Sequence, residues 1–178
     1  RASDSVAAHA GVGLNGAISG WTWSFSGNAD LNDTWTTTQR VVSGLAYTDK
    51  SHAISKSADA EGVLAGTVFQ PPAGAATTSM KVGASTLNLD TTSLRASVAR
   101  QAVLSRDKGA LQASFDLPVA SRSKGVLSGL GDLSFNVNAA LDHLSDFGEL
   151  TTLGGGVNWA PVKPLRLIAS FTQEEGAP

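Results

Sequence analysis

Five carboxylates lie close together in the last third of the sequence, where they could work as acid and base. Asp142, Asp146 and Glu149 form a cluster, and Glu174 and Glu175 follow near the end of the chain. A glycosidase uses two such carboxyls, one as proton donor and the other as nucleophile or base. If the segments that carry these residues approach one another, a hydrolytic pair results. The alternative is that they are solvated loop tips, where acidic residues are common.

A second candidate chemistry involves the histidines, which are His9, His52 and His143. They share no metal-ligand spacing and cysteine is absent, so we expect no metal site and no cofactor. His143 stands beside Asp142 and near Asp146, as a general acid/base pair requires, and Ser145 completes a Ser-His-Asp set. Triads are recognised by geometry and serine is abundant here, so the same residues also fit an ordinary polar loop.

Residues 11–16 read Gly-Val-Gly-Leu-Asn-Gly, which has the G-x-G-x-x-G spacing of dinucleotide-binding turns, and Asp33 follows about twenty residues later. That motif requires a helix to begin after the glycines and hold the pyrophosphate at its N-terminus. Here an alternating strand follows. We interpret the segment as a glycine-rich hairpin whose turn is Asn15-Gly16.

Composition excludes several classes of protein. A formal net charge of -2 gives no sign of a nucleic-acid partner, and the lack of cysteine removes thiol catalysis and disulfides. No apolar run approaches the ~18 residues of a membrane helix, and we recognise no signal peptide. Membrane β-strands need only ~9–11 alternating residues, so a membrane location stays open. Nineteen glycines and 16% charged residues favour closely packed strands over a helical domain.

The carboxylates at 142–149 belong to the clearest β-pattern in the chain, residues 133–171. Leu133, Phe135 and Val137 alternate with polar neighbours, a period of two that no helix places on one face. Two further alternating segments, 153–159 and 165–171, flank the prolines at 161 and 164, and proline cannot donate to a strand ladder. This stretch predicts a three-stranded meander with one apolar face.

The rest of the chain shows the same pattern less clearly. Strands are expected at 6–14, 21–31, 35–47, 53–61, 78–88, 94–104 and 111–117, with turns or loops at 15–16, 48–52, 71–74, 106–109 and 121–131. We predict a single domain over residues 1–178, an all-β antiparallel meander of about nine or ten strands in a β-barrel or barrel-derived sheet. Its apolar face, against lipid or in a core, would comprise Trp21, Trp23, Phe25, Leu133, Phe135, Val137, Trp159, Leu165, Leu167 and Phe171.

Three motifs resemble TonB-dependent outer-membrane receptors. Residues 69–74, Phe-Gln-Pro-Pro-Ala-Gly, look like a periplasmic hairpin of these barrels, and residues 113–119, Ala-Ser-Phe-Asp-Leu-Pro-Val, resemble the strand before the next such turn. The strongest match runs from residue 144 to 172 and includes Asn-Trp-Ala-Pro-Val-Lys-Pro-Leu at 158–165 and Ala-Ser-Phe-Thr at 169–172, which are similar to their Trp-x-Pro turn and the strand that follows it. The resemblance covers most of the chain in the right order.

This resemblance implies a bacterial outer-membrane barrel that takes up siderophores, cobalamin or carbohydrates with energy from the TonB system. Such receptors have a 22-stranded barrel, an N-terminal plug domain, a TonB box and a signal peptide. We find none of the last three in this sequence and expect a partial barrel. Its partners would be outer-membrane lipid and the TonB system, or further copies pairing with its open strand edges.

Two alternatives belong to other functional classes. A free-standing soluble β-barrel would bury the apolar face and could bind small molecules or act as a hydrolase through Asp142, His143, Asp146 and Glu149. A self-assembling structural protein would instead stack its strands with those of other copies. Solubility without detergent separates the membrane hypothesis from the soluble one, because an uncovered apolar face aggregates in buffer.

Overall fold

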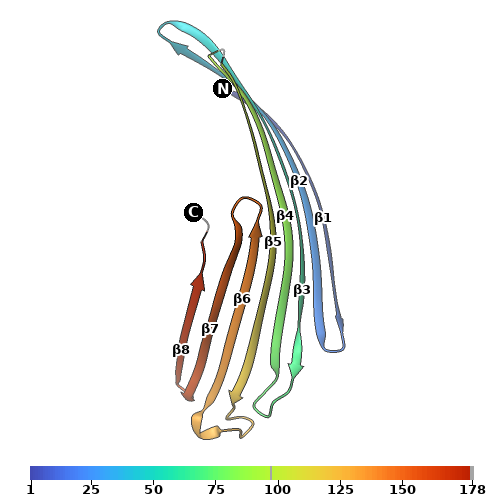
Figure 1. The fold of residues 1–178 in the computed structure, drawn as a ribbon, viewed down its shortest axis with the longest axis vertical. Helices are drawn as coiled ribbons and strands as arrows, with labels where there is room; N and C mark the ends of the chain where they lie inside the picture. The colour runs from blue at the N-terminus through green and yellow to red at the C-terminus, as the bar shows by residue number, and fades with distance from the viewer. Residues whose placement is uncertain (97, 177–178) are drawn as a thin grey trace. The chain divides into compact units, whose positions relative to one another are not determined.

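The computed structural model describes residues 1–96 and 98–176 (Figure 1). Within these residues the chain forms eight strands and one short 3-10 helix, η1 (Ser128–Leu130). The strands are β1 (Ala2–Ile18), β2 (Trp21–Val42), β3 (Leu45–Phe69), β4 (Ala76–Arg95), β5 (Val98–Ala120), β6 (Asp132–Leu144), β7 (Gly148–Val162) and β8 (Leu165–Glu174). No helix in the described part of the chain is long and apolar enough to cross a membrane.

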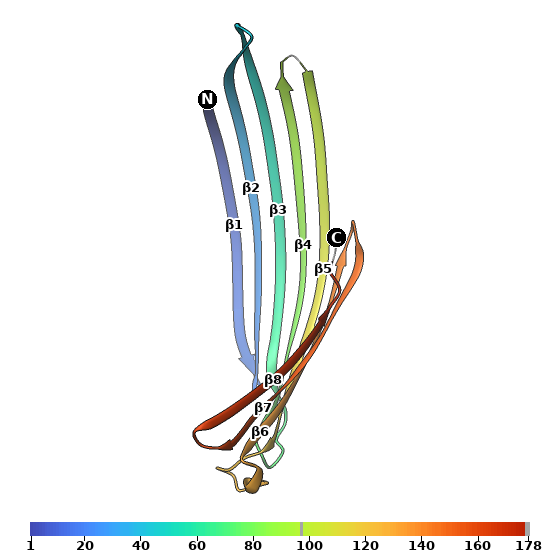
Figure 2. The ribbon, with the colours of Figure 1, turned by 90° about the vertical axis from the view of Figure 1, so that its left-hand side faces the viewer.

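The eight strands form one sheet in which each strand pairs with its neighbours in sequence, β1 to β8 in order. The views in Figures 1 and 2 show β1 to β5 running side by side in this order. The sheet is not closed, because the described strands end at β1 on one edge and β8 on the other. This confirms the predicted all-β antiparallel meander. Eight strands replace the nine or ten expected. β3 and β5 each continue through a segment predicted as a loop, and β2 continues across the gap at 32–34 between two predicted strands.

By its internal contacts the chain divides into two compact units, which are described separately. Unit 1 comprises Arg1–Val12, Ser26–Ala60 and Ala84–Lys108. Unit 2 comprises Gly13–Phe25, Glu61–Gly83 and Gly109–Pro178, and it includes all of β6, β7 and β8. The expected single domain over residues 1–178 stays a prediction.

Neither unit has the interior of a soluble globular domain. No large side chain among the described residues is fully buried, and the buried apolar residues are Ala73, Ala76, Ala120 and Leu144. Large apolar side chains are instead exposed along every strand. A soluble domain of this length normally buries about 70% of the surface of its unfolded chain. The apolar residues here therefore need a covering that the described chain does not supply.

Two hairpin turns have the same Ser-Gly sequence and the same backbone conformation. Ser19 and Gly20 have φ of 48° and 82°, and Ser43 and Gly44 have φ of 52° and 81°. Positive φ at both central residues is the signature of a type I′ turn, whose twist matches that of the flanking strands. The predicted turn at Asn15-Gly16 is wrong, because both residues lie within β1.

The charged segments 48–52 and 106–109, predicted as loops, are also within strands, β3 and β5. Cross-strand pairing explains the first. Asp49 forms an ion pair with Nε of Arg40 at 3.1 Å and accepts a hydrogen bond from the backbone N–H of Ala96 at 3.0 Å. The strand predicted over 94–104 is interrupted, since β4 ends at Arg95 and β5 begins at Val98.

The other predicted breaks are confirmed. The backbone N–H of Gly74 donates to the carbonyl of Pro71 at 3.0 Å and closes the turn between β3 and β4. Residues 121–131 connect β5 to β6 through a bridge between Ser121 and Val126 and through η1. Lys163 and Pro164 separate β7 from β8, next to a bulge between Trp159 and Val162.

Candidate functional site

The register of β6, β7 and β8 sorts their side chains into two faces. Phe135 pairs with Val157, and Val157 pairs with Ala169. Residues directly opposite in antiparallel strands point to the same side of a sheet, so each set of partners forms a row across it. The apolar rows are Leu133–Trp159–Leu167, Phe135–Val157–Ala169 and Val137–Gly155–Phe171.

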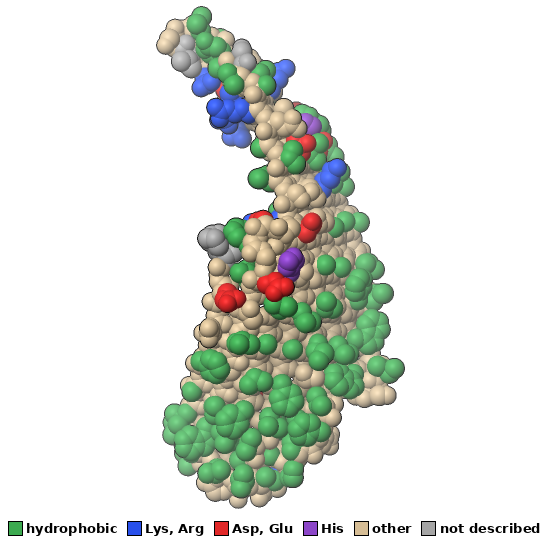
Figure 3. Space-filling model, in the orientation of Figure 1, with side chains coloured by type: hydrophobic (Ala, Val, Ile, Leu, Met, Phe, Trp, Pro, Cys, Tyr) green, Lys and Arg blue, Asp and Glu red, His purple; other side chains and the backbone are tan. Residues whose placement is uncertain are grey.

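On β6 this apolar face is the more exposed one, while β8, at the edge, is exposed on both faces. Phe135, Val137 and Phe171 have exposed fractions of 42%, 54% and 67%, whereas Asn136 and Asn138 on the opposite face are half-buried. Figure 3 shows hydrophobic side chains covering much of the visible surface of β6, β7 and β8. A soluble sheet places its apolar residues inside, so this arrangement is inverted. It is the arrangement of a membrane barrel, with apolar residues outside and polar residues inside.

The polar face is built around glycines. A Cβ atom on Gly154 would lie 2.6 Å from Oδ1 of Asn138, and one on Gly156 would lie 2.9 Å from Oδ1 of Asn136. Each amide therefore lies directly over a glycine of the neighbouring strand, which leaves no room for a side chain there. The cross-strand pairs Asn136–Gly156 and Asn138–Gly154 line this face with amide donors and acceptors.

On the apolar face, Gly155 leaves a shallow hollow of about 400 Å³ that includes Phe135, Val137, Val157 and Phe171 in its lining. The Phe171 ring partly covers the glycine, since a Cβ there would lie 2.9 Å from Cε1 of Phe171. The hollow is apolar and open, and a binding site for a hydrocarbon chain needs both properties.

Aromatic residues of unit 2 gather where its strands meet the short turns. The Trp21 ring lies over Gly66 and the Trp23 ring over Gly16, at 2.5 Å and 2.8 Å from the positions a Cβ would take. The rings of Phe69 and Phe115 stack with centroids 6.3 Å apart. Gly16 lies within β1, and the Trp23 ring leaves no space for a Cβ there. This glycine therefore serves packing and not a turn.

Trp159 also belongs to this group, and its indole N–H donates to the carbonyl of Leu130 at 2.8 Å. Aromatic residues with one polar atom favour the membrane–water interface, where that atom stays hydrated or hydrogen-bonded. The group comprises Trp21, Trp23, Phe69, Phe115 and Trp159, which we term the aromatic end of unit 2.

We expect Trp159→Phe to lower the free energy of unfolding by about 0.5–1.5 kcal/mol, the net value of one hydrogen bond. The substitution keeps a ring on the surface but leaves the Leu130 carbonyl without its donor. Urea titration in detergent micelles, followed by circular dichroism, measures the change. Trp23→Phe is the matched control, because the described residues show no hydrogen bond from its indole. Equal losses in both variants would contradict this role of the hydrogen bond.

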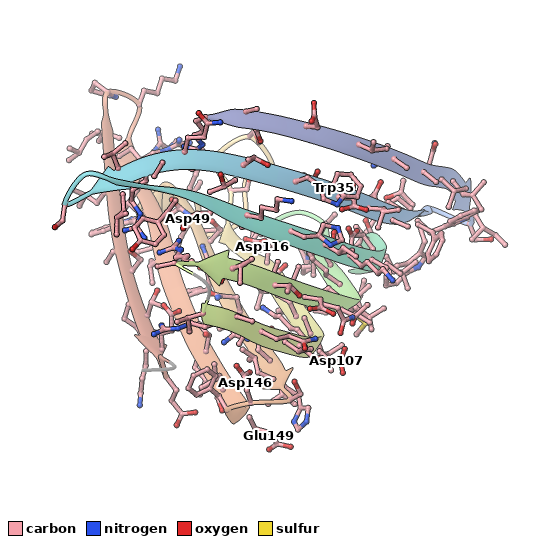
Figure 4. The ribbon with its side chains drawn as sticks, turned by 90° about the horizontal axis from the view of Figure 1, so that it is seen from above. Trp35, Asp49, Asp107, Asp116, Asp146 and Glu149 are labelled. Atoms are coloured by element: carbon pink, nitrogen blue, oxygen red, sulfur yellow. The ribbon has the colours of Figure 1, made fainter. Side chains whose placement is uncertain are left out.

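The predicted acid–base residues lie at the turn between β6 and β7. His143 pairs across the strands with Glu149, and Asp142 pairs with Leu150. Asp142 and His143 are adjacent in a strand and so point to opposite faces, which separates the proposed acid/base pair. Figure 4 shows Asp146 and Glu149 at this turn.

The second group of carboxylates, Glu174 and Glu175, also lies in unit 2 and is next to β7. The side chain of Glu175 accepts a hydrogen bond from the backbone N–H of Thr151 at 3.1 Å, and Glu174 pairs with Thr152. Glu175 is therefore used to tie the end of the chain to β7. A catalytic role for Asp142, His143, Asp146 or Glu149 stays a prediction. The described residues contain no group of three or more potential metal ligands.

Two histidine–carboxylate pairs in unit 1 were not predicted. His9 Nδ1 lies 2.7 Å from Oδ1 of Asp30, and His52 Nε2 lies 2.6 Å from Oδ1 of Asp33. The second pair is the less exposed, and the ring of Trp35 stacks on His52 with centroids 4.8 Å apart. Each pair joins neighbouring strands, so finding it required the strand register, which the sequence does not state.

No protein-family model and no curated protein matches this sequence. The structure is similar to part of the RagAB peptide transporter, with a TM-score of 0.65 and 13% sequence identity. The match covers 88% of this chain and 20% of that one, so this chain spans about a fifth of the transporter chain. At this level of identity the similarity establishes the fold alone.

A second structure is the β domain of the Bordetella autotransporter Brka, at 16% identity over 99% of this chain and 86% of that one. Its TM-score of 0.26 is too low to indicate a shared fold.

Proposed function

We propose that this chain forms part of the wall of a bacterial outer-membrane β-barrel transporter, of the TonB-dependent receptor type. The observation that carries the proposal is the inverted pair of faces on β6, whose apolar rows continue across β7 and β8. Exposed Phe135, Val137 and Phe171 would meet lipid, and half-buried Asn136 and Asn138 would line the lumen. The fold it shares with part of the RagAB peptide transporter supports the proposal.

The dimensions of the apolar face suit a bilayer. The apolar face of β6 spans the nine-residue segment from Leu133 to Leu141, and a tilted membrane strand needs ~9–11 residues. The aromatic end of unit 2 lies at the same end of the strands as the turn after β7, while Asp142, Asp146 and Glu149 lie at the turn before β7. Interfacial aromatics at one limit and carboxylates at the other would position the strands in the membrane.

The open edges indicate that the wall continues. Strands β1 and β8 each have one side without a partner strand among the described residues. In lipid every backbone N–H and C=O must be paired, since an unpaired group costs several kcal/mol. Under this proposal both edges would pair with further strands of the barrel.

Size-exclusion chromatography with light scattering, on the 178-residue chain with and without detergent, tests this proposal directly. We expect aggregation in buffer and a β-rich, monodisperse species in detergent micelles, because detergent covers the apolar rows. A folded, monodisperse β-rich species in plain buffer would overturn the proposal. Substrate screening with Asp142, Asp146 and Glu149 variants would then examine the soluble hydrolase alternative.

The proposal extends to the kind of solute transported, as a class. The receptor resemblance implies siderophores, cobalamin or carbohydrates, and the similar transporter carries peptides. All are polar solutes, which a lumen lined by amides and hydroxyls accommodates through hydrogen bonds.

A further inference from the structure

Unit 1 contains a groove that is unlike the rest of the protein in its charge. It has a volume of about 370 Å³ and is lined by residues of β2 and β3 together with Arg1 and Arg95. Its described lining includes Arg1, Arg40 and Arg95 together with the single carboxylate of Asp49, although the whole sequence has a net charge of -2. Lys50 also belongs to the lining, but it follows Asp49 directly in β3 and so points to the opposite face. Figure 3 shows Lys and Arg side chains gathered close to the β2–β3 turn.

The strand pattern places the groove on the polar side of unit 1. Thr36, Thr38 and Arg40 alternate along β2 and so point to one face, opposite to Leu31 and Trp35. The hydroxyl of Thr36 is hydrogen-bonded to Ser3 of β1 at 3.2 Å. A ligand would therefore reach the groove from water and not across the face that carries Trp35.

The one carboxylate of the groove already has partners. Asp49 is held by Nε of Arg40 at 3.1 Å and by the N–H of Ala96 at 3.0 Å, and its side chain is 16% exposed (Figure 4). Within the described residues no carboxylate forms an ion pair with Arg1 or Arg95. Positive charge is thus left over in the groove, beside threonine hydroxyls that can donate hydrogen bonds.

We propose that this groove binds a small, phosphate-bearing anion from the aqueous side. The planar guanidinium presents paired N–H donors that match phosphate oxygens, and each phosphate group carries about -1.5 to -2 charges at neutral pH. One or two such groups would balance the surplus cations, whereas a monocarboxylate would not. The groove volume of about 370 Å³ leaves room for a diphosphate.

This inference goes beyond the barrel-wall proposal and is independent of it, because it needs only unit 1 and no lipid. Isothermal titration of pyrophosphate into the 178-residue chain, kept in uncharged detergent at pH 7, is the experiment. We expect saturable binding that weakens when the salt concentration rises from 50 to 200 mM. Citrate, an anion of similar charge, is titrated in parallel and should bind at least about tenfold more weakly.

Three variants locate the site. Arg95→Gln should weaken pyrophosphate binding about tenfold, since it removes a charge-assisted donor. Lys56→Gln removes the same charge from β3 of unit 1 outside the groove and should leave the affinity within twofold. Asp49→Asn keeps an acceptor for the Ala96 N–H but removes the competing charge, so it should tighten binding about threefold or more.

The alternative results are equally definite. No binding to the wild-type chain, or equal weakening by Arg95→Gln and Lys56→Gln, would overturn the site. Equal affinity for citrate would overturn the assignment of the ligand as a phosphate. The chain is also mixed with phosphatidylcholine vesicles that contain or lack phosphatidic acid. Binding to phosphatidic acid without binding to pyrophosphate would show a lipid headgroup site and refute the soluble ligand.

Discussion

Replacing Val137 with arginine is expected to destabilise the chain in a lipid bilayer by about 2–4 kcal/mol, the cost of a lipid-facing cation near the midplane. Val137 is the central residue of the apolar run from Leu133 to Leu141, and its side chain is 54% exposed. This loss corresponds to about 30-fold or more in the folding equilibrium. Urea titration of the chain in phosphatidylcholine vesicles, followed by tryptophan fluorescence, measures it.

Asn138→Arg is the matched control, because Asn138 is the next residue of β6 and points to the polar face. A cation that reaches water costs little, so we expect a change within about 1 kcal/mol. Val137→Leu, which keeps the site apolar, should also stay within about 1 kcal/mol. If Asn138→Arg destabilised the chain more than Val137→Arg, the lipid-facing side would be the polar one and the assignment of faces would be reversed.

Gly131→Ala should lower the free energy of unfolding by about 2–4 kcal/mol, from overpacking together with a strained backbone. Gly131 has φ of 88°, a conformation that side chains other than glycine rarely adopt. A Cβ there would lie 2.8 Å from Cα of Pro161 and would collide with the carbonyl oxygen of Ala160. That oxygen accepts a hydrogen bond from the Arg122 guanidinium, so two connections of unit 2 would be disturbed together.

Gly129→Ala provides the comparison for Gly131→Ala. Gly129 is two residues away in η1, has no positive φ, and has no atom within 4 Å of the position a Cβ would take. We expect its stability to stay within about 0.5 kcal/mol of the unmodified chain in detergent micelles. Similar losses for both alanine variants would mean that the close approach of Gly131 to β7 does not limit stability.

The strands that could be predicted from sequence are those with strict alternation. Along 133–138, apolar and polar residues alternate without interruption, which predicts a strand with one apolar face, and the register of β6 and β7 agrees with this prediction. The turns were harder to predict, because glycine has two uses. Gly20 supplies positive φ in a turn, whereas Gly16 makes room for the Trp23 ring, and the sequence alone does not separate these roles.

The candidate sites could be predicted only in part for a related reason. Local clusters such as Asp142 to Glu149 are visible in the sequence, and the structure places them at one turn. The pairs His9–Asp30 and His52–Asp33 and the groove beside Arg40 join residues on neighbouring strands. Their proximity depends on hairpin length and register, which were mispredicted wherever charged residues such as Asp49 continue a strand.

The order of the strands also bears on how such a chain is assembled and how it can change in evolution. Every described strand pairs with the strand next to it in sequence. Even Asp132 and Ala160, the pair of the β6–β7 ladder farthest from its turn, belong to one hairpin. Contacts of this kind are local along the chain, so a sheet can grow one hairpin at a time from a preformed edge. The same property makes the hairpin a natural unit of duplication, because a gained or lost pair of strands leaves the remaining ladders unchanged.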